Sequence, residues 1–333
     1  MLLRLSAALL AWLLVLSAAT AADLRFFRIG TGSVSGTYFR IGGLIADAVS
    51  SPPGSRPCEK GGSCGVPGLV ALAQTSEGSV SNAEGIISGA FESGFVQSDV
   101  AYAAYRGTGV FHGRLPAEEL RAIANLYQES IHLVVRAGLD VSSVRDLEGL
   151  RVGLDEEGSG TQADARLILE AFGLSEEAID ASYDMPAVAL ARMRAGELDA
   201  MFLVGGYPMA IIDELIRELD ARLVPIKGPE ADRLVREHAY LAFDIIPFGV
   251  YGNGRSVETL GVGAQWIVRA DLEEELAYEL TRALWHPVTG DILREGHPRG
   301  RDITLQTALE GIAIPLHPGA ERFYREKGLL GDE

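Results

Sequence analysis

The feature that most constrains the fold is a loop rich in glycine and hydroxyl residues, which joins an extended run to an amphipathic helix near the start of the chain. Residues 25–29 (RFFRI) are typical of a β-strand, and the loop GTGSVSGTY follows over 30–38. From Tyr38 onward, apolar residues recur at three- and four-residue spacing, which predicts a helix. The first amides of such a helix have no partner within it and carry the positive end of its dipole. The order of strand, loop and helix therefore predicts an α/β unit that can bind an anion.

Nucleotide-binding and catalytic motifs fit this loop less well. It lacks the Lys-Ser or Lys-Thr pair of a phosphate loop, and it lacks the third glycine of the dinucleotide fingerprint. The central residue of Gly32-Ser33-Val34-Ser35-Gly36 is Val34, so the segment does not match a nucleophile elbow. A purely structural glycine turn is the alternative that the loop alone leaves open.

The first 22 residues predict a secretory signal peptide. One basic residue, Arg4, precedes an apolar run over 7–16 and small residues over 18–22. The apolar run is too short to span a bilayer, and a retained anchor is the alternative. We therefore expect a mature periplasmic chain that begins at about residue 23. The net charge of −17 argues against nucleic acid and anionic lipid as partners.

The two cysteines, Cys58 and Cys64, lie in a loop rich in glycine and proline. In an oxidising compartment, a nearby pair of this kind predicts a disulfide. No histidine lies close to them in sequence, so we expect neither a metal nor a cofactor. Three other residues, His286, His297 and His317, each precede a proline, which predicts turns or extended breaks.

Two further polar turns follow predicted strands in the first part of the chain. The strands are expected at 69–73 and 95–96, and the turns over 75–79 and 97–99 each open a helix. Ser79 is expected to cap the first of these helices, which runs to Gly89. Successive strand, turn and helix units predict a parallel sheet whose turns meet at one edge. Ligands of open α/β sheets bind at that edge, so these turns are expected to converge with the loop over 31–38.

The pattern changes in the middle of the chain. Two extended runs, 123–127 and 131–135, are parted by only three polar residues, which suggests that the chain leaves one lobe for another. A strand over 151–154 ends in DEEGSGT before a helix that stops at Gly173, and this repeats the opening arrangement in the second lobe.

The rest of the chain continues the alternation of strands and helices. We expect strands at 200–204 and 259–268, and helices at 209–219, 272–285 and 304–311. Pro208, in the turn Gly205-Gly206-Tyr207-Pro208, can start the first of these helices. Residues 240–254 have no clear assignment.

Taken in this order, these segments resemble the TAXI-type solute-binding proteins of tripartite ATP-independent periplasmic (TRAP) transporters. The resemblance covers nearly all of the chain after residue 22, and it is carried by IGTG (29–32), GTY (36–38), GSVSN (78–82), QSDVA (97–101), LY (126–127) with His132, GSGT (158–161), GGYP (205–208) and the strand and helix over 262–285. It implies a type II periplasmic-binding-protein fold, with two α/β lobes and a ligand cleft between them. Lobe I would comprise 23–128 and 263–333, and lobe II 129–262.

The resemblance implies a receptor and not an enzyme. Such a receptor closes on a small organic acid or amino acid, of the glutamate, glutamine or dicarboxylate class, and delivers it to the membrane subunits of a TRAP permease; a monomer is expected. Two alternatives remain open. One is a binding protein of an ATP-driven importer or a sensor. The other is an extracytoplasmic hydrolase that uses Ser33, Ser159 or Asp99, although no Ser, His and acid motif supports it.

The expected ligand contacts come from both lobes. They are Thr31, Ser33, Gly36, Thr37, Tyr38, Gln97 and Ser98 on the first wall, Ser159, Gly160 and Thr161 on the second, and Tyr127, Gly206 and Tyr207 beside the carbon chain of the ligand. Backbone amides, hydroxyls and aromatic rings would then bind a carboxylate without an arginine clamp. The alternative is that 159–161 is only a helix cap.

We predict that Cys58 and Cys64 are joined in the exported protein. The bond closes a small loop, so its contribution to stability is modest, on the order of 2 kcal/mol. Mass measurement of unreduced, alkylated protein should show no free thiol, and two alkylated cysteines would contradict the prediction.

Overall fold

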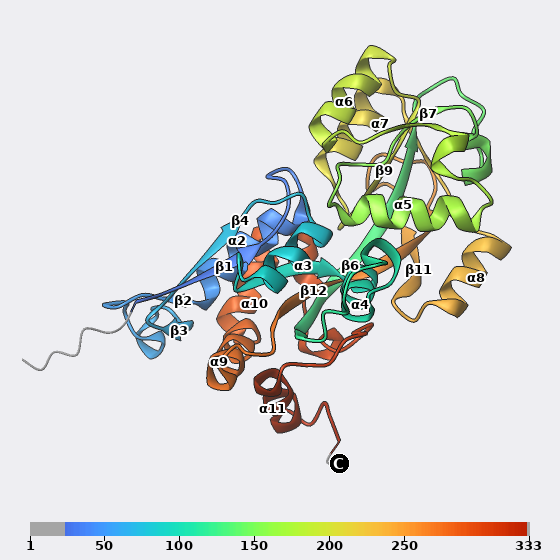
Figure 1. Cartoon of the computed structure of the whole chain (residues 1–333). Helices are drawn as coiled ribbons and strands as arrows, with labels where there is room; N and C mark the ends of the chain where they lie inside the picture. Colours follow the sequence, from blue (N-terminus) through green and yellow to red (C-terminus); the bar gives the residue numbers. More distant parts are fainter. Residues whose placement is uncertain (1–23, 332–333) are drawn as a thin grey trace, which may run out of the picture.

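The computed structural model describes residues 24–331, and it shows two groups of helices at the opposite ends of two long strands (Figure 1). These strands are β6 (Leu120–Val135) and β12 (Val257–Arg269). The predicted signal peptide lies outside the described residues. We refer to the two groups, with the strands that they cover, as the first and second lobes.

The first lobe contains the parallel sheet predicted from the opening segments. Its strand β1 (Arg25–Gly30) pairs in parallel with β4 (Leu69–Gln74) and β5 (Ser93–Gln97). The helices that follow these strands are α2 (Thr37–Val49), α3 (Ser79–Ser88) and α4 (Ser98–Arg106). Three helices from the end of the chain complete this lobe: α9 (Glu274–Leu284), α10 (Pro287–Gly296) and α11 (Pro318–Glu326).

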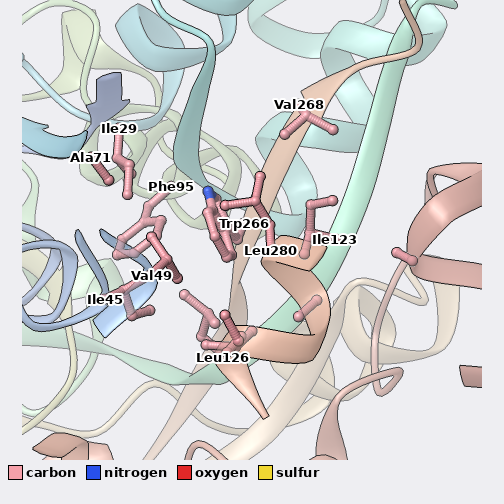
Figure 2. Packing of buried hydrophobic residues seen from close by; sticks show 14 of the residues in the cluster. Ile29, Ile45, Val49, Ala71, Phe95, Ile123, Leu126, Trp266, Val268 and Leu280 are labelled. Carbon is pink, nitrogen blue, oxygen red and sulfur yellow. The ribbon is translucent and has the colours of Figure 1, made fainter. Parts of the chain in front are cut away.

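Large apolar side chains from both ends of the chain fill the core of the first lobe (Figure 2). Trp266 of β12 is fully buried, and its ring meets that of Phe27 edge to face at 6.5 Å. Phe95 of β5 is also fully buried and meets Tyr38 edge to face at 5.6 Å. This second contact places Tyr38, at the start of α2, directly against the core.

The second lobe is a mixed sheet with helices around it. The second half of β6 pairs antiparallel with β9 (Ala200–Gly205) and β10 (Arg222–Val224), and β7 (Arg151–Gly153) pairs in parallel with β8 (Asp180–Ser182) and β9. Its helices are α5 (Gly160–Ala171), α6 (Pro186–Ala195), α7 (Ala210–Leu219) and α8 (Pro229–Glu237). The strand β11 (Leu241–Ile246) pairs antiparallel with β12.

The connection between the lobes is the antiparallel pair of β6 and β12. The two extended runs expected at 123–127 and 131–135 are in fact one strand, because the polar residues between them keep pairing with β12. On β6, Tyr127 packs in the core of the first lobe and Ile131 in the core of the second. On β12, Ala264 packs in the first core and Val262 in the second. The detailed lobe boundaries stay a prediction.

Several expectations for the last part of the chain need correction. The helix expected at 304–311 is wrong, since this segment contains only the 3₁₀ turn η6 (Leu305–Thr307). Part of the unassigned segment 240–254 forms β11. Each of the three histidines that precede proline lies at a helix start, where its ring accepts a hydrogen bond from the amide two residues later: His286 from Val288, His297 from Arg299 and His317 from Gly319.

The cysteine loop lies between two short paired strands, β2 (Ser50–Ser51) and β3 (Val66–Pro67). Cys58 and Cys64 form a disulfide there, with 4.6 Å between their Cα atoms, which confirms the expected bond. Over residues 24–331, no helix combines the length and the apolar character that crossing a membrane requires.

Phe95→Ala is expected to lower the free energy of unfolding by about 3–5 kcal/mol, because it leaves a cavity in the core of the first lobe. Phe26→Ala is the matched control: Phe26 is 59% exposed on the neighbouring strand β1, and its loss should change stability by no more than about 0.5 kcal/mol. Chemical denaturation measures both, and equal effects would contradict the packing described here.

Candidate functional site

A cavity lies between the two lobes, where the loops after β1, β4 and β7 meet. It is lined from the first lobe by Gly32, Ser33, Ser35, Gly36, Thr37, Tyr38, Glu77, Gly78, Ser79 and Gln97, from the second by Asp155, Glu156, Ser159, Gly160, Thr161, Pro186, Leu203, Val204, Met209 and Ile211, and at the boundary between them by Glu129 of β6. Its volume, measured as the space open to the centre of a water molecule, is about 80 Å³. One water needs roughly 10–15 Å³ by this measure, so the cavity suits a small ligand.

Three helices begin at this cavity. They are α2, which begins at Thr37, α3, which begins at Ser79, and α5, which begins at Gly160. Gly36 and Gly78 precede two of them and supply no side-chain cap, contrary to the expectation that Ser79 caps α3. The third is capped by Ser159, whose Oγ accepts a hydrogen bond from the Gln162 amide at 3.1 Å. The first amides of these helices can therefore bind a negatively charged group.

The lobes touch each other beside the cavity. The amides of Val80 and Ser81 donate hydrogen bonds to the Gly158 carbonyl oxygen at 3.0 and 3.1 Å. A Cβ added to Gly160 would lie 1.4 Å from Oε1 of Gln97, so any larger residue there would displace the Gln97 side chain from this contact between the lobes. The structure is thus that of a closed cleft.

Four acidic side chains line the cavity, and none of the lining residues is basic: the acids are Glu77, Glu129, Asp155 and Glu156. Glu129 is 3% exposed, and burial raises its pKa to about 8. Burial also raises the pKa of Asp155, to about 6. Glu129 is therefore mostly protonated at neutral pH, and the cavity carries less negative charge than its composition suggests.

Two buried acceptor atoms in the cavity wall have no hydrogen-bond partner within the described part of the chain. They are Oε2 of Glu129 and Oε1 of Gln97. The hydroxyl of Tyr38 lies beside Glu129, but it does not satisfy Oε2. Because buried polar atoms are nearly always paired, both atoms call for a ligand that forms hydrogen bonds: Oε1 of Gln97 needs a donor, and Glu129 needs one when its carboxyl group is ionised.

The structure brings eight of the expected ligand contacts together at the cavity, namely Ser33, Gly36, Thr37, Tyr38, Gln97, Ser159, Gly160 and Thr161. The hydroxyl of Thr37 donates to the Gly206 carbonyl oxygen across the cleft, at 3.1 Å. Oγ1 of Thr161 accepts from the Val204 amide at 3.1 Å. Ser159 and Thr161 accept these backbone bonds and offer their hydroxyl protons to the neighbouring Asp155 carboxyl group, so a ligand in the cleft would compete with Asp155 for them.

The other five expected contacts lie outside the cavity lining: Thr31, Ser98, Tyr127, Gly206 and Tyr207. The first two are fully buried and bond to the backbone, Thr31 to the Gln74 oxygen at 2.6 Å and Ser98 to the Tyr240 oxygen at 3.1 Å. Tyr127 and Tyr207 pack against the guanidinium of Arg299, at 5.8 and 4.6 Å from their ring centroids.

The sequence alone assigned no role to four residues of the site region: Glu129, Asp155, Glu156 and Arg299. Glu129 was counted only among the three polar residues between two extended runs, and Asp155 and Glu156 only as part of the segment DEEGSGT. Arg299, which is 7% exposed, donates to the Gln128 oxygen from η5 (Pro298–Arg301) and brings a positive charge behind the cavity wall. No local pattern marks it, because 171 residues separate the two partners.

A group with metal-ligand chemistry lies away from this cavity. Cys58, Cys64 and His286 place one ligand atom each within 4.8 Å of one another, and no other group of this kind occurs among residues 24–331. The two sulfur atoms are bonded to each other, so they are not thiolate ligands.

Comparison with known proteins places this geometry in a family. Residues 29–328 match the NMT1-like family. The structure is similar to that of PhnD1 from Prochlorococcus marinus in complex with methylphosphonate, at 12% sequence identity over 92% of this chain and 99% of that chain, with a TM-score of 0.50. It is also similar to a structure of a periplasmic transporter, at 14% identity over 93% of this chain and 94% of that chain, again with a TM-score of 0.50.

At these identities the similarity concerns the fold. Two α/β lobes, two crossing strands and a cleft between the lobes agree with the architecture expected from the sequence. The protein therefore has the two-lobed fold of the periplasmic binding proteins, and it belongs to the NMT1-like family.

Proposed function

We propose that this protein is an extracytoplasmic solute-binding receptor of a TRAP transporter, which holds a small carboxylate ligand between its lobes and passes it to the membrane subunits. The observation that carries the proposal is the meeting of three helix N-termini, from α2, α3 and α5, at one closed cleft. Their amides and the hydroxyls of Ser159 and Thr161 offer donors to a carboxylate.

Within the expected ligand class, the acidic lining of the cavity favours amino acids over dicarboxylates. A dicarboxylate would bring two negative charges to a cavity that contains no base, and like charges repel at short range. An amino acid such as glutamate or glutamine brings an ammonium group as well. That ammonium group could donate to Oε1 of Gln97 and would favour the ionised, accepting form of Glu129, and both side chains have an unpaired oxygen. We therefore propose an amino acid as the ligand.

The cavity supports binding better than catalysis. Ser33 and Ser159 line it, but no histidine does, and a serine nucleophile needs an adjacent base. The buried His132 is engaged elsewhere, with its Nε2 3.0 Å from the hydroxyl of Tyr251. The third candidate of the hydrolase alternative, Asp99, is not part of the cavity lining.

The fold and the cleft constrain the membrane partner less than they constrain the ligand. A binding protein of an ATP-driven importer or of a membrane sensor would share the fold and the cleft. Permease genes of the TRAP type beside the gene of this protein would support the proposal, and an adjacent ATPase gene would support the importer.

Calorimetry with glutamate, glutamine and glutarate tests the ligand class. At least one of the two amino acids should bind without chemical conversion. Glutarate, which lacks the ammonium group, should bind about ten- to a hundredfold more weakly, because a charge-assisted hydrogen bond is worth roughly 1.5–3 kcal/mol. Glutarate binding as tightly as the amino acids would contradict the ligand class, and sustained turnover would contradict the receptor.

Ser159→Ala and Thr161→Val test the second wall. Both should lower the stability of the ligand-free protein by about 1 kcal/mol, Ser159→Ala because the helix cap is lost and Thr161→Val because the Val204 amide loses its acceptor. Both should also weaken binding of the tightest ligand by about tenfold or more, since each removes a hydroxyl group from the cleft. Ser55→Ala is the control, because the Ser55 hydroxyl makes no hydrogen bond to residues 24–331. If the melting temperature falls while the ligand affinity stays within twofold of the wild-type value, these residues only stabilise the start of the helix.

A further inference from the structure

Two aspartates face each other across the boundary between the lobes, away from the ligand cavity. Asp99 lies in the first turn of α4 in the first lobe, and Asp164 lies in α5 in the second. Asp99 is 8% exposed, and Asp164 is fully buried. Asp99 lines one pocket together with Ala163 and Arg166 of α5, which lie on either side of Asp164 in the sequence, and the two carboxyl groups are close enough for a hydrogen bond when one of them is protonated.

Among residues 24–331, no positive charge is paired with these carboxyl groups. Three of their buried oxygens, both of Asp164 and Oδ1 of Asp99, have no hydrogen-bond partner in this part of the chain. The titratable and charged groups around the pair are Glu129 of β6, Tyr102 of α4, Tyr240 before β11, and Arg166 and Glu170 of α5. The one base among them, Arg166, is engaged by Glu176 at 2.7 Å.

Physical chemistry restricts the charge that this pair can carry. Two carboxylates in contact and out of water repel each other, and each loses its hydration, so at most one of them ionises readily. Burial raises the pKa of Asp99 to about 7, and burial together with the neighbouring Asp99 carboxyl raises the pKa of Asp164 well above its usual range. Glu129 adds a further acidic group on the same side.

We propose that closure of the two lobes binds a proton between Asp99 and Asp164, so that ligand binding is coupled to proton uptake. The inference rests on the proposed function in one respect, namely that the ligand drives closure. In the open protein, the two helices separate and both carboxyl groups face water, where they ionise at ordinary acidic pH. In the closed protein, one carboxyl group stays protonated and donates a hydrogen bond to the other across the lobe boundary.

The direction of the coupling follows from the raised pKa values. The closed state binds more protons than the open state, so it is favoured at low pH and loses that advantage as pH rises through the pKa of the closed pair. The more acidic group of the closed pair loses its proton near pH 7, and the last proton leaves at a higher pH, so affinity should fall at least about tenfold between pH 6 and pH 8. At least about one proton should be taken up for each ligand bound at pH 6.

Asp164→Asn tests the pair, because the amide has the same shape, does not ionise and can donate to Asp99. Calorimetry with glutamate and glutamine at pH 6 and pH 8, in two buffers of different ionisation enthalpy, gives both affinity and proton uptake. The wild type should show the tenfold change, and the variant less than twofold. The double variant Asp99→Asn/Asp164→Asn should behave like the single one. Glu170→Gln, an exposed acid on the same helix, is the matched control and should keep the wild-type response.

Three outcomes would overturn the inference. The first is a tenfold pH effect that persists in both asparagine variants, which would assign the proton to Glu129. The second is a wild-type affinity that does not change with pH. The third is recovery of affinity at pH 8 on adding sodium or calcium chloride, which would make the pair a cation site.

The inference can be tested even if neither amino acid binds, in which case only the proposed ligand fails. Small-angle scattering of the ligand-free wild type should then show a smaller radius of gyration at pH 5.5 than at pH 8.5. Asp164→Asn should show no such difference. A radius that does not depend on pH in the wild type would overturn the proton-linked closure.

Discussion

The antiparallel pair of β6 and β12 is the interaction on which the rest of the structure depends. Each strand contributes to the cores of both lobes, and the two pair from Ser130 and Gly261 to Leu120 and Arg269. Side-chain bonds lie at the second-lobe end of the pair, where Thr259 donates to the Ile131 oxygen and Ser130 donates to Asp244 of β11. The lobes are therefore joined by backbone ladders whose ends can bend, which is the geometry of a hinge.

The pair also accounts for the chemistry of the cleft. Glu129 lies in the centre of β6 at the lobe boundary, where the closed lobes exclude water from its carboxyl group. Three helix N-termini supply positive potential on either side, each worth about 0.3–1 kcal/mol toward a nearby anion. The cavity thus combines helix N-termini that can bind an anion with acidic side chains that are only partly ionised. A ligand that carries both a carboxylate and a donor group fits this combination best.

The parts of the molecule that could be predicted are those encoded locally. The loops before α2 and α5 can be predicted from their glycine and hydroxyl residues, and the helices that follow can be predicted from their helical periodicity. Tertiary contacts decided the rest. Residues 304–311 do not form a helix because Asn125 of β6 donates to the Ala308 oxygen at 2.7 Å. The pairing of Asp99 with Asp164 and the placement of Arg299 behind the cleft arise only when distant segments fold together.

Amide hydrogen exchange at Val80 and Ser81 tests the central claim, that the lobes close on a small ligand, most directly. These amides donate to the Gly158 oxygen of the opposite lobe, so their protection reports closure itself. With a saturating amino acid ligand, both should exchange at least about tenfold more slowly than in the free protein. Unchanged exchange at both amides, while calorimetry shows the ligand bound, would contradict the account.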